Sequence, residues 1–297
     1  MRIVVAGILI LAASGAVGCA STPDGGADQP VRIERGPPPS YAEVAATLNA
    51  RAEILRRVWA YATIHVWWVN DKGKQQEDQL ETLVMLDQPD RVYMRFRKAT
   101  VDLAILGCDE QQYWWIDLGK PRQAWLGSHD QATPERMARF AMPIHPLDFV
   151  QVLGMAPVPT DAAGTSVAWS DDGRHLMVET PSRFGRRRLA LEPREGGYDP
   201  AEIELLDHAG RVTITAKLTK YEPAPMPRGR PTDRVPKEVH FRIAGSDTRA
   251  RFRPRYDSPL KVRDKAFDRE QLFKAKRIDA SNIVSLDDEM VRAGDGG

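Results

Sequence analysis

The sequence predicts a mainly β fold: a half-open antiparallel β-barrel with an N-terminal helix and a short helical insertion. Five runs of strand length between Trp59 and Leu118 are rich in Trp, Tyr, Val, Ile and Leu, which favour a pleated surface. Short polar joints separate these runs, so we expect neighbouring strands to pair antiparallel. Further strand-length runs follow from Ser166 to Arg253, beginning with a hairpin at Ser170–Gly173. Because no composition break divides the two series, they predict one continuous, partly opened barrel.

The first nineteen residues have the pattern of a secretory signal. Arg2 precedes an apolar run from Ile3 to Ala13, which is too short for a transmembrane helix, and small residues follow it. The ending Ala16-Val17-Gly18-Cys19 resembles the bacterial lipobox. That resemblance implies that residues 1–18 are a removed signal peptide and that Cys19 carries lipid on its sulfur and its amine. An ordinary signal peptide with a chance cysteine is the alternative.

Residues 19–40 are rich in Pro, Gly and Asp and are expected to form a disordered tether. A single acyl chain binds a membrane only marginally, whereas the several chains of a lipidated cysteine would hold the protein there almost irreversibly. These expectations place the protein in the bacterial cell envelope, membrane-anchored and facing the periplasm. Ala20 stands where an aspartate often signals inner-membrane retention, which favours the outer membrane.

The charge balance argues against nucleic acid as a partner. The chain has 42 basic and 41 acidic residues, and its first eighteen residues contain Arg2 and no acid, so their removal leaves a neutral chain. A nucleic-acid-binding protein needs a net or clearly segregated basic field. Arg249, Arg251, Arg253 and Arg255 do share one strand face. We interpret it as a solvated outer face with acidic neighbours, and contact with lipid phosphates is the alternative.

Two helical segments are expected on either side of the first strands. Tyr41–Val58 has apolar residues at helical spacing, with Ser40 as the N-cap and Glu43 as its capping-box partner. Thr133–Phe140 and Pro146–Leu153 form a second, Met-containing helical segment. This insertion is interpreted either as a lid over the meander or as a plug that fills the open side of the sheet.

Pairs of tryptophans mark the expected apolar surface of the meander. Two neighbouring tryptophans place one ring on each face of a strand, so such a pair either packs the core and a rim or lines a lipid-sized groove. Together with apolar residues of the helical insertion, they are the candidate lining of a lipid cavity: Trp67, Trp68, Trp114, Trp115, Met137, Phe140, Phe149 and Leu153.

No catalytic, metal-binding or cofactor-binding motif is present. The six histidines lack zinc spacing, and there is no Gly-x-Ser-x-Gly elbow, P-loop or dinucleotide fingerprint. Cys108 has no basic neighbour in the sequence and is interpreted as structural. The sequence therefore predicts no enzyme and no cofactor, with a hydrolase assembled from distant Ser, His and acid residues as a remaining alternative.

Several segments together resemble the LolA/LolB-like lipoprotein carrier superfamily. They are the first helix at Leu48–Leu55, the Leu86–Val92 turn leading into Tyr93–Phe96, the glycine and aromatic residues at Gly107–Trp115, and the closing segment Ile278–Leu286. The resemblance covers about residues 41–286 and implies a half-open barrel whose apolar cavity binds acyl chains under helices. A soluble carrier has no lipid of its own, so the lipobox points to the anchored, receptor-like members or to a lipid-binding cousin of them.

The expected organisation is thus a signal peptide at 1–18, a tether at 19–40 and a single LolA/LolB-like domain at 41–290. We expect a lipid-anchored protein that binds lipid or lipoprotein acyl chains, possible roles being lipoprotein sorting and lipid transfer. Its partners are then the membrane, through Cys19, and an acyl chain, while no protein partner can be named. The alternative is a structural or assembly lipoprotein whose core is filled by its own side chains.

Overall fold

The computed structural model describes residues 32–69, 74–137, 144–161, 163–244 and 248–288, and all of these described residues belong to one compact unit. Fourteen strands form one sheet in the order β14-β6-β5-β4-β3-β2-β1-β13-β12-β11-β10-β9-β8-β7. The strands are β1 (Arg57–Val69), β2 (Gln75–Asp87), β3 (Arg91–Lys98), β4 (Val101–Cys108), β5 (Gln112–Asp117), β6 (Gln123–Ser128), β7 (Ser166–Trp169), β8 (Leu176–Ser182), β9 (Gly185–Arg194), β10 (Gly197–Asp207), β11 (Val212–Pro223), β12 (Arg234–Ile243), β13 (Arg249–Asp257) and β14 (Ile283–Ser285).

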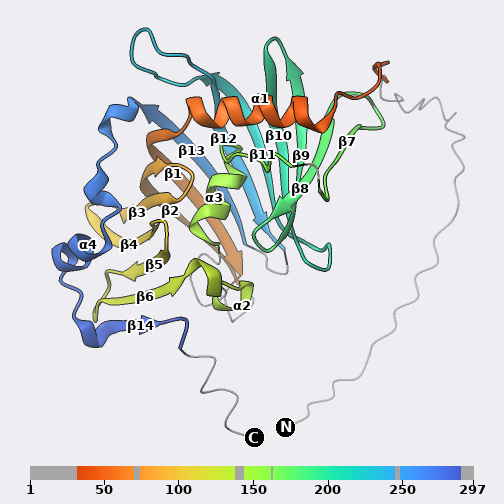
Figure 1. The fold of residues 1–297 in the computed structure, drawn as a ribbon. Helices are drawn as coiled ribbons and strands as arrows, with labels where there is room; N and C mark the ends of the chain where they lie inside the picture. Colours follow the sequence, from red (N-terminus) through yellow and green to blue (C-terminus); the bar gives the residue numbers. More distant parts are fainter. Residues whose placement is uncertain (1–31, 70–73, 138–143, 162, 245–247, 289–297) are drawn as a thin grey trace, which may run out of the picture. The chain divides into compact units, whose positions relative to one another are not determined.

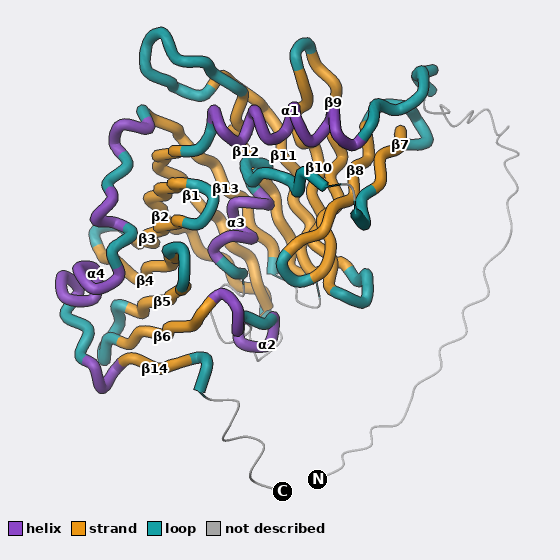
Figure 2. Tube along the Cα trace, viewed as in Figure 1, coloured by secondary structure: helices purple, strands orange, loops and turns teal. Residues whose placement is uncertain are grey.

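Few helices accompany this sheet (Figure 2). The α-helices are α1 (Tyr41–Ile54), α2 (Pro134–Met137), α3 (Pro146–Val152) and α4 (Arg269–Lys276), and the short 3-10 helices are η1 (His129–Gln131), η2 (Pro259–Lys261), η3 (Asp264–Ala266) and η4 (Ala280–Asn282). Within the described ranges, none of the helices has the length and apolar character needed to span a bilayer.

The predicted open, mainly antiparallel sheet is confirmed. β1 to β6 form a meander with antiparallel pairing throughout, and β7 to β13 form a second one. The two series join where β13 pairs with β1, for example Ile64 opposite Phe252. Only β14 adds a parallel pair, to β6. The described edge strands β14 and β7 do not pair with each other, so the sheet curls without closing (Figure 1).

Helix α1 begins where the sequence predicts and ends four residues early. The Ser40 N–H donates to Glu43 Oε2 at 2.8 Å, and the Glu43 N–H donates back to Ser40 Oγ at 3.4 Å, which completes the capping box. The helix was expected to reach Val58. Instead Arg57 and Val58 pair with Asp87 and Leu86 of β2, so strand pairing prevails over the helical pattern at this point.

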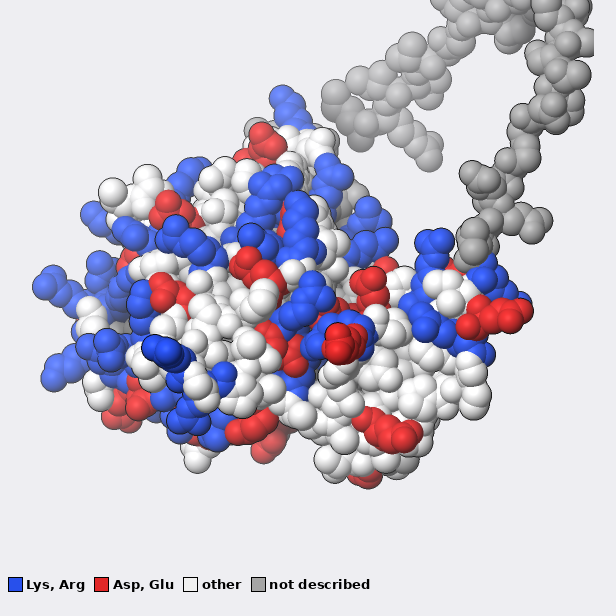
Figure 3. Space-filling view, turned by 90° about the horizontal axis from the view of Figure 1, so that it is seen from above, with Lys and Arg blue, Asp and Glu red and all other residues white. Residues whose placement is uncertain are grey.

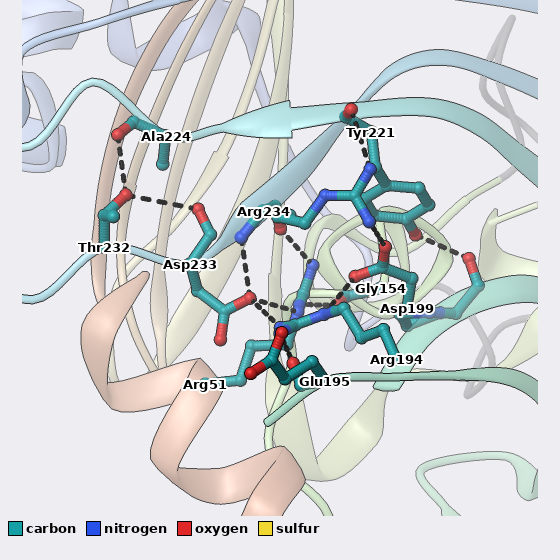
Figure 4. A network of polar contacts seen from close by, with 11 residues as sticks. Arg51, Gly154, Arg194, Glu195, Asp199, Tyr221, Ala224, Thr232, Asp233 and Arg234 are labelled. Atoms are coloured by element: carbon teal, nitrogen blue, oxygen red, sulfur yellow. Dashed lines mark hydrogen bonds and ion pairs between the residues drawn. The ribbon is translucent and has the colours of Figure 1, made fainter. Parts of the chain in front are cut away.

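A network of ion pairs joins α1 to the sheet (Figure 4). Arg51 is 4% exposed, and it donates to the carbonyl oxygens of Gly154 and, at 2.7 Å, Arg234. Its guanidinium also lies 3.7 Å from Asp233, and Asp233 accepts from Arg194 at 2.5 Å. The helix, the segment after α3 and the strands β9 and β12 are therefore fixed to one another by the same few side chains.

Each face of the sheet has its own hydrophobic core. The larger core lies on the concave face, where α1 and α3 pack against inward-facing side chains of both strand series. On the opposite face, Phe267, Leu272 and Phe273 of the C-terminal segment cover Ile105 and Trp114 of the first series. The C-terminal segment contains α4 and β14, and β14 lies within the closing segment Ile278–Leu286.

Residues 32–40, the described end of the expected tether, lie against the β7–β8 turn. The Ile33 N–H donates to Asp172 O at 2.9 Å, and Arg35 Nε donates to Gly173 O at 3.1 Å. Trp169 Nε1 donates to Gly36 O at 3.0 Å. This part of the chain is therefore held against the folded unit by hydrogen bonds. Residues 19–31 lie outside the described residues.

Candidate binding pocket

The space that was expected to form a cavity, between the meander and the helical insertion, is filled. Helix α3 contacts β3, β4 and β10, and Phe149 and Leu153 are 0% and 2% exposed. The Phe149 ring centroid lies 5.5 Å from that of Phe252 and 6.5 Å from that of Phe241. The expected position of the cavity is therefore wrong, because α3 itself occupies the concave side of the meander.

A pocket lies on the other side of the same insertion, against the second strand series. Its volume is about 540 Å³. The start of α3 and the end of α2 form one wall, and the β8–β9 hairpin and the ends of β10 to β13 form the rest. Its described lining residues are Pro134, Met137, Ile144, His145, Asp148, Ser182, Phe184, Leu205, Leu206, Asp207, Arg211, Val212, Thr213, Ile214, Ile243, Ala244 and Thr248. Most of these side chains are hydrophobic.

One buried carboxyl group faces this apolar lining. Asp148 lies in the first turn of α3, is 5% exposed, and its Oδ1 accepts from Gln151 Nε2 at 2.8 Å. Burial raises the pKa of Asp148 to about 7, although the guanidinium groups of Arg183 and Arg187 oppose this shift. Near neutral pH the group therefore exists in both forms and can either accept or donate a hydrogen bond.

The neighbouring His145 is held neutral by its surroundings. Its Nδ1 accepts from the Leu147 N–H at 3.2 Å, which makes it the N-cap of α3. Its Nε2 therefore carries the proton and donates to His129 Nδ1 at 3.2 Å, and His129 Nε2 donates to Asp109 O at 2.7 Å. Burial, together with the charge of Arg183, lowers the pKa of His145 well below its usual value. Both of its ring nitrogens are thus engaged.

Five of the eight predicted lining residues lie on the concave face, and one of them lines this pocket. Met137 lines it directly and is 2% exposed. Phe149, Leu153 and Trp115 belong to the buried core of the same face and are not part of the pocket lining. Trp68 alternates onto the concave side at the end of β1 and is half-buried.

The remaining predicted residues do not join this group. Trp67 lies on the opposite face, where its Nε1 donates to Glu77 at 3.0 Å and Arg249 lies 5.6 Å from its ring. Trp114 also lies on that face and is fully buried beneath the C-terminal segment. These two positions correct the predicted lining. Phe140 lies outside the described residues.

Sequence reasoning missed the strand side of the pocket. Leu205, Leu206, Val212 and Ile214 lie on either side of a hairpin at the end of β10 and β11. The consecutive Leu205 and Leu206 beside Asp207 could have indicated an irregularity in this strand, because two adjacent leucines cannot both face one core from a regular strand. The register shift between Leu205 and Leu206 brings both into the lining.

The described residues hold no group of three His, Cys, Asp or Glu side chains that could bind a metal ion. Cys108 is free and buried, its Sγ donates to Asp90 O at 3.1 Å, and burial raises the pKa of its thiol. A protonated, enclosed thiol is a poor nucleophile. The structural interpretation of Cys108 agrees with these contacts.

No protein-family model matches the sequence, and neither does any curated protein. Solved structures of similar fold include a LolA superfamily protein from Nitrosomonas europaea, with 12% identity, a TM-score of 0.49, and coverage of 76% of this chain and 98% of that one. A DUF1329 family protein from Desulfovibrio piger has 12% identity, a TM-score of 0.47, and coverage of 78% and 97%. A putative outer membrane lipoprotein-sorting protein domain from Vibrio parahaemolyticus has 10% identity, a TM-score of 0.44, and coverage of 78% and 97%. A LolA superfamily protein is thus among the similar structures, as the resemblance in the sequence predicted.

Proposed function

We propose that this chain is a lipid-anchored protein of the bacterial cell envelope that binds lipid, or the acyl chains of lipoproteins, in the pocket beside α3. Sorting of lipoproteins and transfer of lipid are the two roles that such binding would serve. The lipobox supports anchoring through lipidated Cys19, facing the periplasm, and Ala20 supports the outer membrane. We infer binding rather than catalysis, because both ring nitrogens of His145 are engaged and none is left to activate a nucleophile.

The pocket itself is the observation that supports this proposal most directly. Its volume of about 540 Å³ lies within the range of small-molecule sites, roughly 300–1,000 Å³. Each methylene that an acyl chain buries among these hydrophobic side chains contributes about 0.8 kcal/mol. Asp148 provides a polar position at the α3 wall, where the polar end of an acyl ligand could form a hydrogen bond.

The proposal is tested on the full chain with Cys19→Ser, so that the protein's own lipid is absent. Organic extraction followed by mass spectrometry is expected to recover an acyl ligand, and a fluorescent fatty acid is expected to bind. Val212→Trp should weaken fatty-acid binding roughly tenfold, because displacing two methylenes costs about 1.6 kcal/mol. Val101→Trp, at an exposed site away from the pocket, serves as the matched control. If extraction and titration both fail, the acyl-binding proposal is wrong.

A second candidate function rests on the filled concave side of the meander. Because α3 occupies that space with fully buried side chains, the protein would be a structural or assembly lipoprotein without a ligand. Under this alternative, Val212→Trp fills an empty hollow and raises the unfolding temperature without changing any binding. Failure of the extraction, combined with unchanged membrane anchoring, would favour this alternative.

A further inference from the structure

The outward face of β13 is a row of arginines. Successive strand residues point to opposite faces, and Ala250 and Phe252 are buried on the concave side. The side chains of Arg249, Arg251, Arg253 and Arg255 therefore point outward, and we call these four residues the arginine band. Arg249, Arg253 and Arg255 are exposed, and Arg251 is half-buried.

Exposed apolar side chains of β1 lie beside the arginine band. In the β1–β13 register, Tyr61 is opposite Arg255 and Trp67 is opposite Arg249. Tyr61 is 40% exposed, and Val69, on the same face of β1, is 41% exposed. The guanidinium carbons of Arg249 and Arg251 lie 5.6 and 5.8 Å from the Trp67 ring centroid, at cation–π distance.

The neighbouring strands on one side add positive charge. Arg242 of β12 is opposite Arg249, and Lys217 of β11 is opposite His240. Among the described ion pairs here, a single carboxylate, Glu238, is shared by the band and its neighbours: Arg253 lies 3.3 Å away, Arg251 4.0 Å, Lys220 2.6 Å and His240 3.0 Å. These hydrogen bonds and positive charges lower the pKa of Glu238 to about 2, so it stays ionised.

The positive field is local rather than general. Glu77 and Glu81 of β2 border the band beyond β1, and Glu202 of β10 pairs with Lys217 at 3.7 Å. The view in Figure 3 likewise shows Lys and Arg gathered in places on the surface, with Asp and Glu between them. In a chain whose formal charge is +1, such segregation creates an attractive site for an anionic surface.

The arginine band begins at the same edge of the sheet as residues that line the pocket. Arg249 directly follows Thr248, and Arg242 directly precedes Ile243, and both Thr248 and Ile243 line the pocket. Strand β1 ends at this same edge of the sheet, since its residue Trp67 pairs with Arg249. Val69 is the last residue of β1. Cationic and apolar side chains of the outward face therefore lie at the same edge of the sheet as part of the pocket lining.

We propose that the arginine band, with Tyr61, Trp67 and Val69, is a docking surface for an anionic phospholipid bilayer. Planar guanidinium groups match phosphate geometry, and a basic residue near an anionic membrane contributes about 1 kcal/mol. Tyrosine and tryptophan favour the boundary between headgroups and acyl chains. The exposed apolar side chains distinguish this surface from a site for a soluble polyanion, which would have no use for Val69.

The proposal is tested by vesicle sedimentation with the full chain carrying Cys19→Ser, which removes the lipid anchor. Vesicles of phosphatidylcholine with about 30% phosphatidylglycerol, whose headgroups give the membrane a negative surface potential, are compared with vesicles of phosphatidylcholine alone. We expect binding only to the anionic vesicles, weakening as salt rises. Replacing all four arginines of the band with glutamine should reduce this binding by about tenfold or more.

A matched control removes the same charge elsewhere, by replacing Arg56, Arg174, Arg228 and Arg230 with glutamine, all exposed outside this face. It should bind as the parent chain does. The double variant Tyr61→Ser and Val69→Ser, which leaves the charge unchanged, should also bind more weakly. Circular dichroism verifies that each variant is folded.

Three results would overturn the proposal. The first is equal binding to neutral vesicles, and the second is an equal loss in the control variant, which would make net charge the cause. The third is binding of a short DNA duplex that is as tight as vesicle binding and is lost in the same band variant. That outcome would make the band a general polyanion site. Both kinds of vesicle offer the pocket the same acyl chains, so the difference between them, and its loss in the band variant, can fail or succeed independently of the proposed function.

Discussion

The absence of a side chain at Gly107 leaves room for the buried ring of Trp114. A Cβ at this position would lie 2.7 Å from Trp114 Nε1 and 2.8 Å from Trp114 Cε2, and the ring is fully buried. Gly107→Ala should therefore lower the free energy of unfolding by about 1–3 kcal/mol, as overpacking does. Chemical denaturation measures this effect. Gly36→Ala, where a Cβ would meet nothing within 4 Å, is the control, and a loss as large there would refute the packing argument.

Asp148 should make stability depend on pH in the opposite direction to most carboxylates. Its pKa is about 7 in the folded protein, against about 3.9 in an unfolded chain. As the pH rises, the unfolded state therefore loses this proton before the folded state does. The stabilisation that Asp148 contributes is fully present below about pH 4 and is lost as the pH rises through 7. Asp148→Asn should reduce the decline in unfolding free energy between pH 5 and 8 by roughly 2–4 kcal/mol.

Urea denaturation at several pH values measures that slope. Asp171→Asn, in the exposed β7–β8 turn, is the control and should leave it unchanged. An Asp148→Asn protein with the parent slope would show that Asp148 ionises normally.

Individual side-chain directions were only partly predictable from the sequence. The Trp114–Trp115 pair was expected to place one ring on each face of a strand, and Trp115 does join the concave core. Trp114 lies on the opposite face, as expected, but it is fully buried there because Phe267, Leu272 and Phe273 cover it from more than 150 residues away. No local pattern around Trp114 contains that information.

Among the secondary-structure elements, α1 depends most on Arg51. Removing this side chain leaves two buried carbonyl oxygens, of Gly154 and Arg234, without their donor. We expect Arg51→Ala to lower the unfolding free energy by about 2–4 kcal/mol, less than a fully orphaned ion would cost, since Asp233 keeps Arg194. Arg56→Ala, whose side chain is 58% exposed, should change it by less than about 0.5 kcal/mol. Equal effects in thermal melts would contradict the role of Arg51.

The sequence predicted the presence of the secondary-structure elements better than the residues at which they end. Ser40 and Glu43 indicated the start of α1 because a capping box is local chemistry. Its end at Ile54 depends on β2, whose Asp87 and Leu86 pair with Arg57 and Val58. Likewise, Pro146 and the apolar residues after it predicted α3, but they could not indicate that the helix would contact strands of both series.

At the scale of the whole molecule, the position of α3 decides where a ligand could bind. Periodicity predicted an open sheet with an apolar concave side, and this is confirmed. It placed the cavity over the meander, whereas α3 fills that side and the hollow lies against β10 to β12. The position of a void depends on the packing of elements far apart in sequence, so the chain's pattern alone does not contain it.

Lipidation should determine the location of the whole protein. The full chain is expected to sediment with membranes and to partition into the detergent phase of a Triton X-114 separation. Cys19→Ser should move it to the aqueous phase, because one or more acyl chains are lost. Cys108→Ser is the matched control, since that thiol is buried and free. If Cys19→Ser remains in the detergent phase after its signal has been removed, anchoring through lipidated Cys19 is wrong.

Photo-crosslinking tests most directly whether the pocket beside α3 holds an acyl chain. A fatty acid with a terminal diazirine is incubated with the Cys19→Ser chain, irradiated, and mapped by peptide mass spectrometry. We predict labelling of peptides that contain Leu205, Leu206, Val212 or Ile214, all lining residues, and its loss in Val212→Trp. Labelling confined to other parts of the chain, or equal labelling in Val212→Trp, would contradict the account.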